Sequence, residues 1–116
     1  MSAARVSIYE FQPEMADEFM LIALTYLLVQ FKALDGFQGF EIVHVSPTEA
    51  MSISRWHSLA HAQRADELGQ QFVRERLAHL VTSTRSYVGE IGFRAPGKHR
   101  PASLAGALPS LSAAEA

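Results

Sequence analysis

Hydrophobic and polar residues alternate at the start of the chain, where Val6 and Ile8 are interleaved with Ser7 and Tyr9. Alternation with a period of two, in a segment rich in β-branched and aromatic residues, predicts a strand over residues 5–11. Ser7 and Tyr9 would then lie on one face of this strand, with Val6 and Ile8 on the other.

A long apolar segment follows and predicts a first helix from Pro13 to about Leu34. Proline is accepted in the first turn of a helix, where its missing N–H costs little, and Gly36 can adopt the left-handed conformation that ends a helix. Apolar residues lie on nearly every side of this helix. We therefore expect it to be covered both by its own sheet and by a second surface.

Two extended segments, residues 37–45 and 51–56, flank a short turn and predict a hairpin whose second strand ends at Trp56. An indole at the junction of sheet and helix is suited to stacking on a planar ligand, and it is equally suited to closing a core.

Ser58 is a suitable N-cap for a second helix over residues 59–68, which we expect Gly69 to break. A further helical segment over residues 70–84 and a last strand over residues 87–93 complete the pattern.

The predicted order of elements is β-α-β-β-α-β, the split βαβ arrangement of ferredoxin-like α+β folds, with one antiparallel sheet in residues 1–94. The helices would cover one face of the sheet, and the apolar residues on the other face call for a partner sheet. From Ala95 the composition changes to Pro, Ala and Ser. We expect residues 95–116 to form an extended tail with no core of its own.

Composition and charge narrow the functional classes. Hydrophobic residues make up 48% of the 116 residues and charged residues only 19%, so we expect this small domain to bury part of its surface in an oligomer. The net charge of −2 gives no electrostatic argument for nucleic acid or an anionic membrane as partner. The absence of cysteine excludes disulfides, thiolate catalysis and thiolate metal sites.

The sequence also favours a soluble, cytoplasmic protein. Its longest apolar run, residues 19–29, is well short of the ~20 residues that cross a bilayer. Residues 1–6 lack the apolar centre of a signal peptide.

Trp56 is the leading candidate for a ligand contact. Ser52 shares its strand face, and small hydroxyl residues beneath an indole leave room and donors for an aromatic ligand. Ser7 and Tyr9 would line the same cleft, and Tyr9 could donate to a phenol or carbonyl oxygen. The competing interpretations are that Trp56 only fills the core and that Tyr9 is a half-buried sheet residue.

His57 and His61 are four positions apart, a spacing that would bring two helical side chains onto one face. No third metal ligand accompanies them, so we expect no metal site and solvated histidines. A role for His61 as a general base is the alternative, because an unperturbed imidazole titrates near neutrality.

Arg76 has two interpretations of similar weight. It could pair with Asp66 on the helix surface, or it could point into the mouth of the cleft and hold a phenolate. The first helix, which includes Tyr26, would supply core or cleft lining.

Several of these segments resemble the antibiotic biosynthesis monooxygenase domain family. The resemblance covers residues 5–93 and rests on Asp35-Gly36-Phe37 entering the second strand, on Arg55-Trp56-His57-Ser58 with the alanines after it, and on the closing Tyr87-Val88-Gly89-Glu90. It implies a homodimer in which two sheets pack face to face, a dimeric α+β barrel.

Family members that oxygenate polycyclic phenols act without metal or flavin, so the resemblance implies a cofactor-independent monooxygenase for an aromatic or quinone-like molecule. Trp56 and Arg76 match residues implicated there, whereas Ser52 and Ala62 replace an asparagine and a tyrosine. These departures leave open a non-catalytic, ligand-binding module of the same fold. Haem-degrading members of the family use polar residues and an axial ligand to the haem iron that are absent here. Haem binding is therefore the third and weakest of the three interpretations.

The candidate site therefore combines two sets of residues. Trp56, Arg76 and His61 are the catalytic candidates, and Ser7, Tyr9, Ser52 and Tyr26 are the ligand-binding candidates. No cofactor is implied.

Overall fold

A computed structural model describes residues 1–97. Its strands form one antiparallel sheet in the order β2-β3-β1-β4, with β1 at the centre beside β3. The strands are β1 (Ala3–Phe11), β2 (Phe37–Ser46), β3 (Glu49–Trp56) and β4 (Val81–Glu90). With the helices placed between β1 and β2 and between β3 and β4, this is the ferredoxin-like α+β fold that the sequence predicts.

The first helical region is one continuous run. A short 3₁₀ turn, η1 (Pro13–Met15), leads into α1 (Ala16–Ile22), a π-helical turn η2 (Ala23–Leu27) and α2 (Leu28–Ala33). The run ends at Ala33, where Leu34 turns to an extended conformation. Gly36 lies in the turn that follows and has a positive φ of 86°, as expected for a residue without a Cβ. Its carbonyl oxygen accepts a hydrogen bond of 2.8 Å from the His57 amide, which joins this loop to the end of the hairpin.

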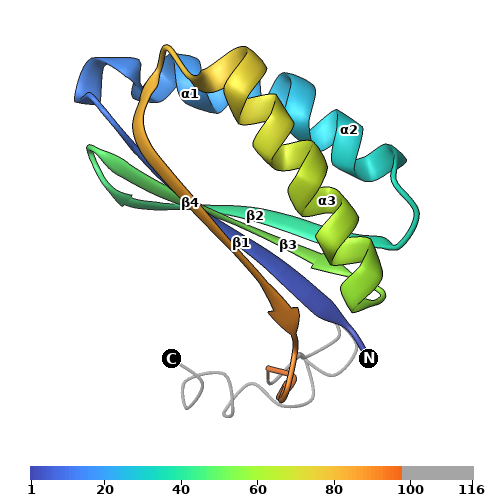
Figure 1. The fold of residues 1–116 in the computed structure, drawn as a ribbon. Helices are drawn as coiled ribbons and strands as arrows, with labels where there is room; N and C mark the ends of the chain where they lie inside the picture. Colours follow the sequence, from blue (N-terminus) through green and yellow to red (C-terminus); the bar gives the residue numbers. More distant parts are fainter. Residues whose placement is uncertain (98–116) are drawn as a thin grey trace, which may run out of the picture.

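The second helical region consists of α3 (Leu59–Phe72) and a π-helical turn η3 (Val73–Leu77). Ser58 caps α3 by accepting from the His61 amide, as predicted. Both helical regions lie on the same face of the sheet (Figure 1).

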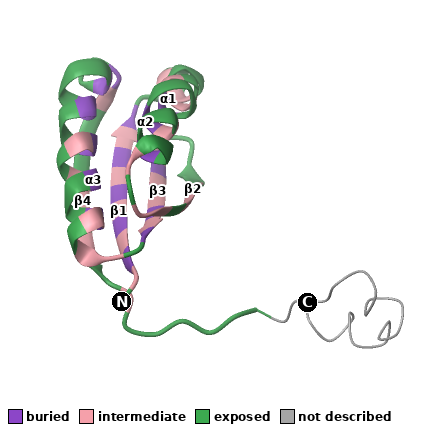
Figure 2. Ribbon diagram, turned by 90° about the vertical axis from the view of Figure 1, so that its right-hand side faces the viewer, coloured by how far each residue is buried: buried purple, intermediate pink, exposed green. Residues whose placement is uncertain are grey.

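Burial alternates along β1 and β3 (Figure 2), and the buried residues of these strands share one core with residues of the helices. The apolar core fills the space between the two layers with aromatic side chains from β1, β3 and both helical regions. Its largest members are Tyr9, Phe11, Phe19, Phe31, Trp56 and Phe72.

Two predicted boundaries in the second half of the domain are wrong. Gly69 does not break the helix, because α3 continues through it to Phe72. Gly69 is buried, and a Cβ built on it would lie 2.5 Å from Arg5 Nη2. The glycine therefore serves a close approach and not a helix end. The last strand begins at Val81, not at residue 87, because the polar segment before Tyr87 pairs with β1.

Part of the first helical region remains uncovered within residues 1–97. Leu21 and Val29 are 65% and 60% exposed, and Leu24 and Tyr26 are also exposed. The second covering surface expected from the sequence is not supplied by the described part of the chain. Within it, no helix is long and apolar enough to cross a membrane. The expected tail lies, beyond residue 97, outside the described residues.

Candidate functional site

Polar side chains interrupt the core on the covered face of the sheet. Ser7 on β1 stands opposite Ser52 on β3 and Ser86 on β4, which makes a row of three serines across the sheet. The neighbouring pair joins Arg5 on β1 to Ser54 on β3. Arg5, Ser7, Ser52 and Ser54 are all buried, with exposures of 3% or less. A covered sheet face is usually apolar, so this polar strip is a candidate ligand surface.

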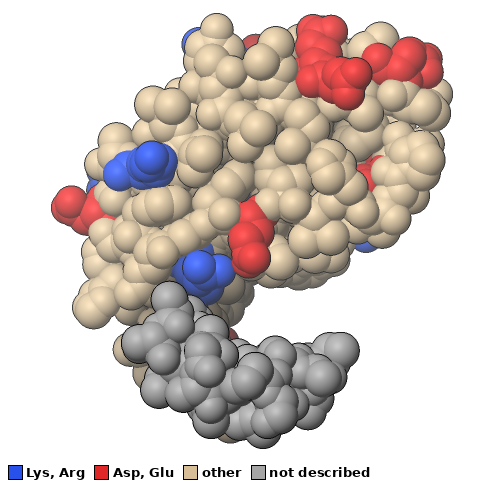
Figure 3. All heavy atoms as spheres, turned by 180° about the vertical axis from the view of Figure 1, so that it is seen from behind, with Lys and Arg blue, Asp and Glu red and all other residues tan. Residues whose placement is uncertain are grey.

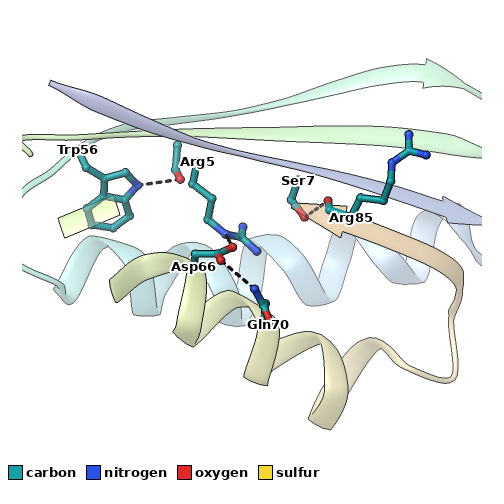
Figure 4. Close-up of polar contacts among 7 residues, drawn as sticks. Arg5, Ser7, Trp56, Asp66, Gln70 and Arg85 are labelled. Atoms are coloured by element: carbon teal, nitrogen blue, oxygen red, sulfur yellow. Dashed lines mark hydrogen bonds and ion pairs between the residues drawn. The ribbon is translucent and has the colours of Figure 1, made fainter. Parts of the chain in front are cut away.

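Trp56 borders the strip but is not open to solvent. Its exposure is 0%, and the rings of Phe31 and Phe37 pack edge-on against it at 5.4 Å between centroids. The indole Nε1 donates a hydrogen bond of 2.8 Å to the Ser54 hydroxyl (Figure 4). The sequence-based expectation of an open cleft under this indole is therefore not met, because Trp56 is fully buried and packed against aromatic neighbours.

Tyr9 is also buried, at 1% exposure, and packs against Phe19 with 4.9 Å between ring centroids. Its hydroxyl group has no hydrogen-bond partner among the described residues. An unpartnered buried hydroxyl is costly, so Tyr9 is a candidate donor to something other than residues 1–97.

Arg5 forms the charged centre of the strip. Its Nε donates to Asp66 Oδ1 on α3 at 2.9 Å, while the Gln70 amide donates to the other carboxylate oxygen at 2.8 Å (Figure 4). Burial raises the pKa of the Asp66 carboxyl, but the Ser86 hydroxyl, the Arg5 guanidinium and the Gln70 amide favour its ionised form more strongly. The pKa of Asp66 is therefore lowered, and the group is ionised at neutral pH.

A hollow of about 350 Å³ opens beside this cluster, between α3 and β4. Its lining residues are Arg5, Gln70, Val73, Arg74, Thr84, Arg85 and Ser86. The Arg85 carbonyl accepts from Ser7, but the Arg85 side chain leaves the sheet on the opposite side, so it adds no cation to the hollow (Figure 4).

His61 lies away from the polar strip, at the start of α3. Its Nδ1 is 2.7 Å from the Ser58 hydroxyl, and its ring is 6.0 Å from that of His57. It borders a wide hollow between α3 and the end of α2. In residues 1–97, no three His, Asp or Glu side chains are grouped to hold a metal ion.

Arg76 and Tyr26 lie together on the outer side of the helices. The Arg76 guanidinium stacks over the Tyr26 ring at 4.6 Å, a cation–π contact, and does not pair with Asp66. Arg76 also lines a groove between α2 and η3, together with Gln30 and Gln71.

The predicted site residues thus fall into three groups. Ser7, Tyr9, Ser52 and Trp56 share the covered face of the sheet, Arg76 meets Tyr26, and His61 stands alone. Arg5 was missed by the sequence interpretation, although it continues the alternation of Ser7 and Tyr9.

Comparison with protein-family models and with curated proteins finds no match for this chain. Solved structures do match. A variant of SnoaB, a cofactor-independent oxygenase from Streptomyces nogalater, superimposes with a TM-score of 0.66 at 15% identity, covering 82% of this chain and 97% of that one.

Two further structures extend the comparison. A proposed antibiotic biosynthesis monooxygenase from Nitrosomonas europaea has a TM-score of 0.65 at 12% identity, covering 82% and 94% of the two chains. A dimeric ferredoxin-like protein from an uncultured marine organism has a TM-score of 0.66 at 13% identity, covering 82% and 91%. Proteins of unknown function share the fold too. The resemblance to the monooxygenase domain is confirmed as a likeness of fold; at these identities it shows nothing further.

Proposed function

We propose that this domain is a cofactor-independent monooxygenase that acts on an aromatic or quinone-like small molecule held between the sheet and the helices. The observation that carries the proposal is the polar strip of Arg5, Ser7, Ser52 and Ser54, buried where an ordinary core would be apolar. Its fold is shared with an oxygenase that needs no cofactor.

The proposed chemistry needs only the substrate and dioxygen. For an anthrone, a proton leaves the ring CH₂ group, and the resulting anion passes an electron to O₂. The radicals combine to a peroxide anion, which takes up a proton and then loses water to leave the carbonyl group. One oxygen atom ends in the new carbonyl group and the other in water, so the four electrons lost by carbon reduce O₂ completely. The protein would hold the anion in a dry site, with the unpartnered Tyr9 hydroxyl as a donor to one of its oxygen atoms and Ser7 beside it.

The candidate residues take different places in this proposal. Trp56 would form a fixed inner wall, because it is fully buried and packed against Phe31 and Phe37. Ser52 would lie next to it on the same strand face. A ligand would touch the Arg76–Tyr26 pair or His61 only if the ligand reached the helix side of the domain.

A non-catalytic binding module is the second candidate. It is favoured because neither His61, the expected general base, nor Asp66 is well placed to accept a proton. The His61 ring is engaged with the Ser58 hydroxyl, and the lowered pKa of Asp66 makes that carboxylate a weak base. Such a site could bind an anion without generating it.

We also propose a homodimer formed through the uncovered face of the sheet. Val6, Ile8, Met51, Ile53 and Tyr87 lie on that face, together with the charged residues Glu41, Arg55 and Arg85. The side of the molecule seen from behind Figure 1 is mostly uncharged, with acidic side chains gathered at one end (Figure 3). An apolar sheet face of this kind suits a second copy of the same face. Light scattering should then give twice the mass of one chain.

Oxygen uptake by the metal-stripped protein tests the function. With anthrones and hydroquinones, we expect protein-dependent uptake that falls at least tenfold in Ser7→Ala or Trp56→Phe and is unchanged in Leu21→Ala, an exposed control. A loss in Arg76→Ala alone would move the ligand to the groove between α2 and η3. Ligand binding without uptake would establish the binding module. Neither binding nor uptake across the panel would contradict both functions.

A further inference from the structure

The hollow between α3 and β4 contains a charged group that its protein partners do not fully satisfy. Arg5 is 1% exposed, and Asp66 accepts from its Nε, yet its Nη1 is buried without a partner in residues 1–97. A guanidinium has five donors, and leaving one of them dry and unbonded is expensive. The free end of the guanidinium points away from Trp56, toward the side of Ser7 (Figure 4).

The helix above is shaped around this group. Gly69 in α3 leaves space that any side chain would take from Arg5, since a Cβ there would lie 2.6 Å from Cζ. Glycine weakens a helix interior, so its place in α3 is explained by the close approach of the guanidinium. The sequence thus accommodates a buried cation at some cost to the helix.

The charge balance of the hollow is positive. The carboxylate of Asp66 neutralises Arg5 and is itself held by Gln70. Arg74 adds a second cation at the exposed rim and forms no ion pair with residues 1–97. Thr84 offers a hydroxyl donor and Val73 an apolar wall, whereas the Ser86 hydroxyl is already engaged with Asp66.

We propose that this hollow is the subsite for the oxyanion of the ligand, and that the ligand is an aromatic carboxylate or phenolate. One ligand oxygen accepts from Arg5 Nη1, the charge of Arg74 attracts the anion at the rim, and the ring lies against Val73. Charge-assisted bonds from a guanidinium to a planar oxyanion are among the strongest that a protein makes. This inference rests on the proposed function only in taking the ligand to be a small aromatic molecule.

The test is a binding titration without turnover. Calorimetry and NMR shift mapping would compare 2-naphthoate with its neutral amide and with inorganic phosphate. We expect naphthoate to bind at least tenfold more tightly than the amide, with shifts centred on Gly69, Val73 and Ser86. Equal affinity for acid and amide, or shifts centred elsewhere, would overturn the proposal. Tighter binding of phosphate than of naphthoate would overturn the aromatic assignment.

Two variants locate the anion. Arg5→Met combined with Asp66→Asn removes the ion pair as a unit, so neither charge is left buried alone, and circular dichroism would check the fold. We expect at least a tenfold loss of naphthoate affinity. Arg74→Gln should cost about threefold, while Arg64→Gln, an equal change of charge on the other side of α3, should cost nothing. Equal effects of Arg74→Gln and Arg64→Gln, or unchanged affinity in the double variant, would contradict the site.

The outcome is separable from that of the oxygenase assay. Anthrone oxidation with no preference for naphthoate would leave the proposed function standing and remove this subsite. Naphthoate binding at Arg5 with no oxygen uptake would keep the subsite and favour the binding module.

Discussion

The two faces of the sheet differ in a way that the usual layering does not predict, because the apolar core on the covered face is interrupted by a polar strip. The covered face carries Arg5, Ser7 and Ser52 in near-complete burial, while the uncovered face carries residues such as Val6 and Ile53. In most antiparallel sheets the apolar side chains lie under the helices and the polar ones face water. The polar strip on the covered face and the apolar residues on the uncovered face are the observations on which the proposed ligand and the proposed homodimer rest.

The largest effect is expected from a substitution that breaks the Arg5–Asp66 ion pair at the centre of the covered face. Asp66→Ala leaves Arg5 buried without its counter-ion, so we expect the free energy of unfolding to fall by about 3 kcal/mol in urea denaturation. Glu67→Ala removes an exposed carboxylate from the next position and should change it by less than about 0.5 kcal/mol. Equal effects would mean that the ion pair is solvated and that the covered face has no charged centre.

A charge on the uncovered face should disrupt association and leave the fold intact. For Ile53→Glu we expect the dimer to weaken by about 2 kcal/mol, or roughly 30-fold in Kd, measured by analytical ultracentrifugation. Leu21→Glu places the same charge on the exposed helix surface and serves as the matched control. Dissociation caused by Leu21→Glu instead would assign the interface to the helices.

The acid sensitivity of the protein should be traceable to the covered face. Asp66 has a pKa below its usual 3.8 in the folded state, so its contribution to stability is complete above that value and is lost as the pH falls through the lowered pKa. Asp66→Asn should remove this part of the pH dependence of the urea midpoint, whereas Glu67→Gln should retain it. A pH profile unchanged by Asp66→Asn would show that other carboxylates dominate acid unfolding.

The smallest expected effect concerns the only tryptophan of the chain. Trp56 is fully buried, so acrylamide should quench its fluorescence weakly in the folded protein and strongly in urea. Strong quenching in the native state would mean that the aromatic packing around it opens, and that the cleft expected from the sequence forms transiently.

The fold was predictable because its signals are local. Alternation placed β1, and the first helical region ends at Ala33, close to the predicted Leu34 and before a turn in which Gly36 has a positive φ. Gly69 misled the prediction, since its role depends on Arg5, which is 64 positions away in sequence and cannot be seen in a local pattern. The polar segment at the start of β4 was assigned to a helix for a similar reason, because pairing with β1 decides its conformation.

The candidate site was predictable only in part. Strand periodicity placed Ser7, Tyr9, Ser52 and Trp56 on one face, as the structure has them. It could not reveal that Phe31 and Phe37 seal the indole, because those contacts form only when the layers pack. Arginine is expected at the surface, so a buried Arg5 gave no signal without its partner on α3.

The hydrogen bond from the His57 amide to the Gly36 carbonyl has a consequence for how the domain opens. The bond joins the loop between α2 and β2 to the short connection between β3 and α3. We therefore expect these two connections to open together. The His57 amide proton should therefore exchange with deuterium only through a cooperative opening of both connections, and far more slowly than its exposed side chain would suggest.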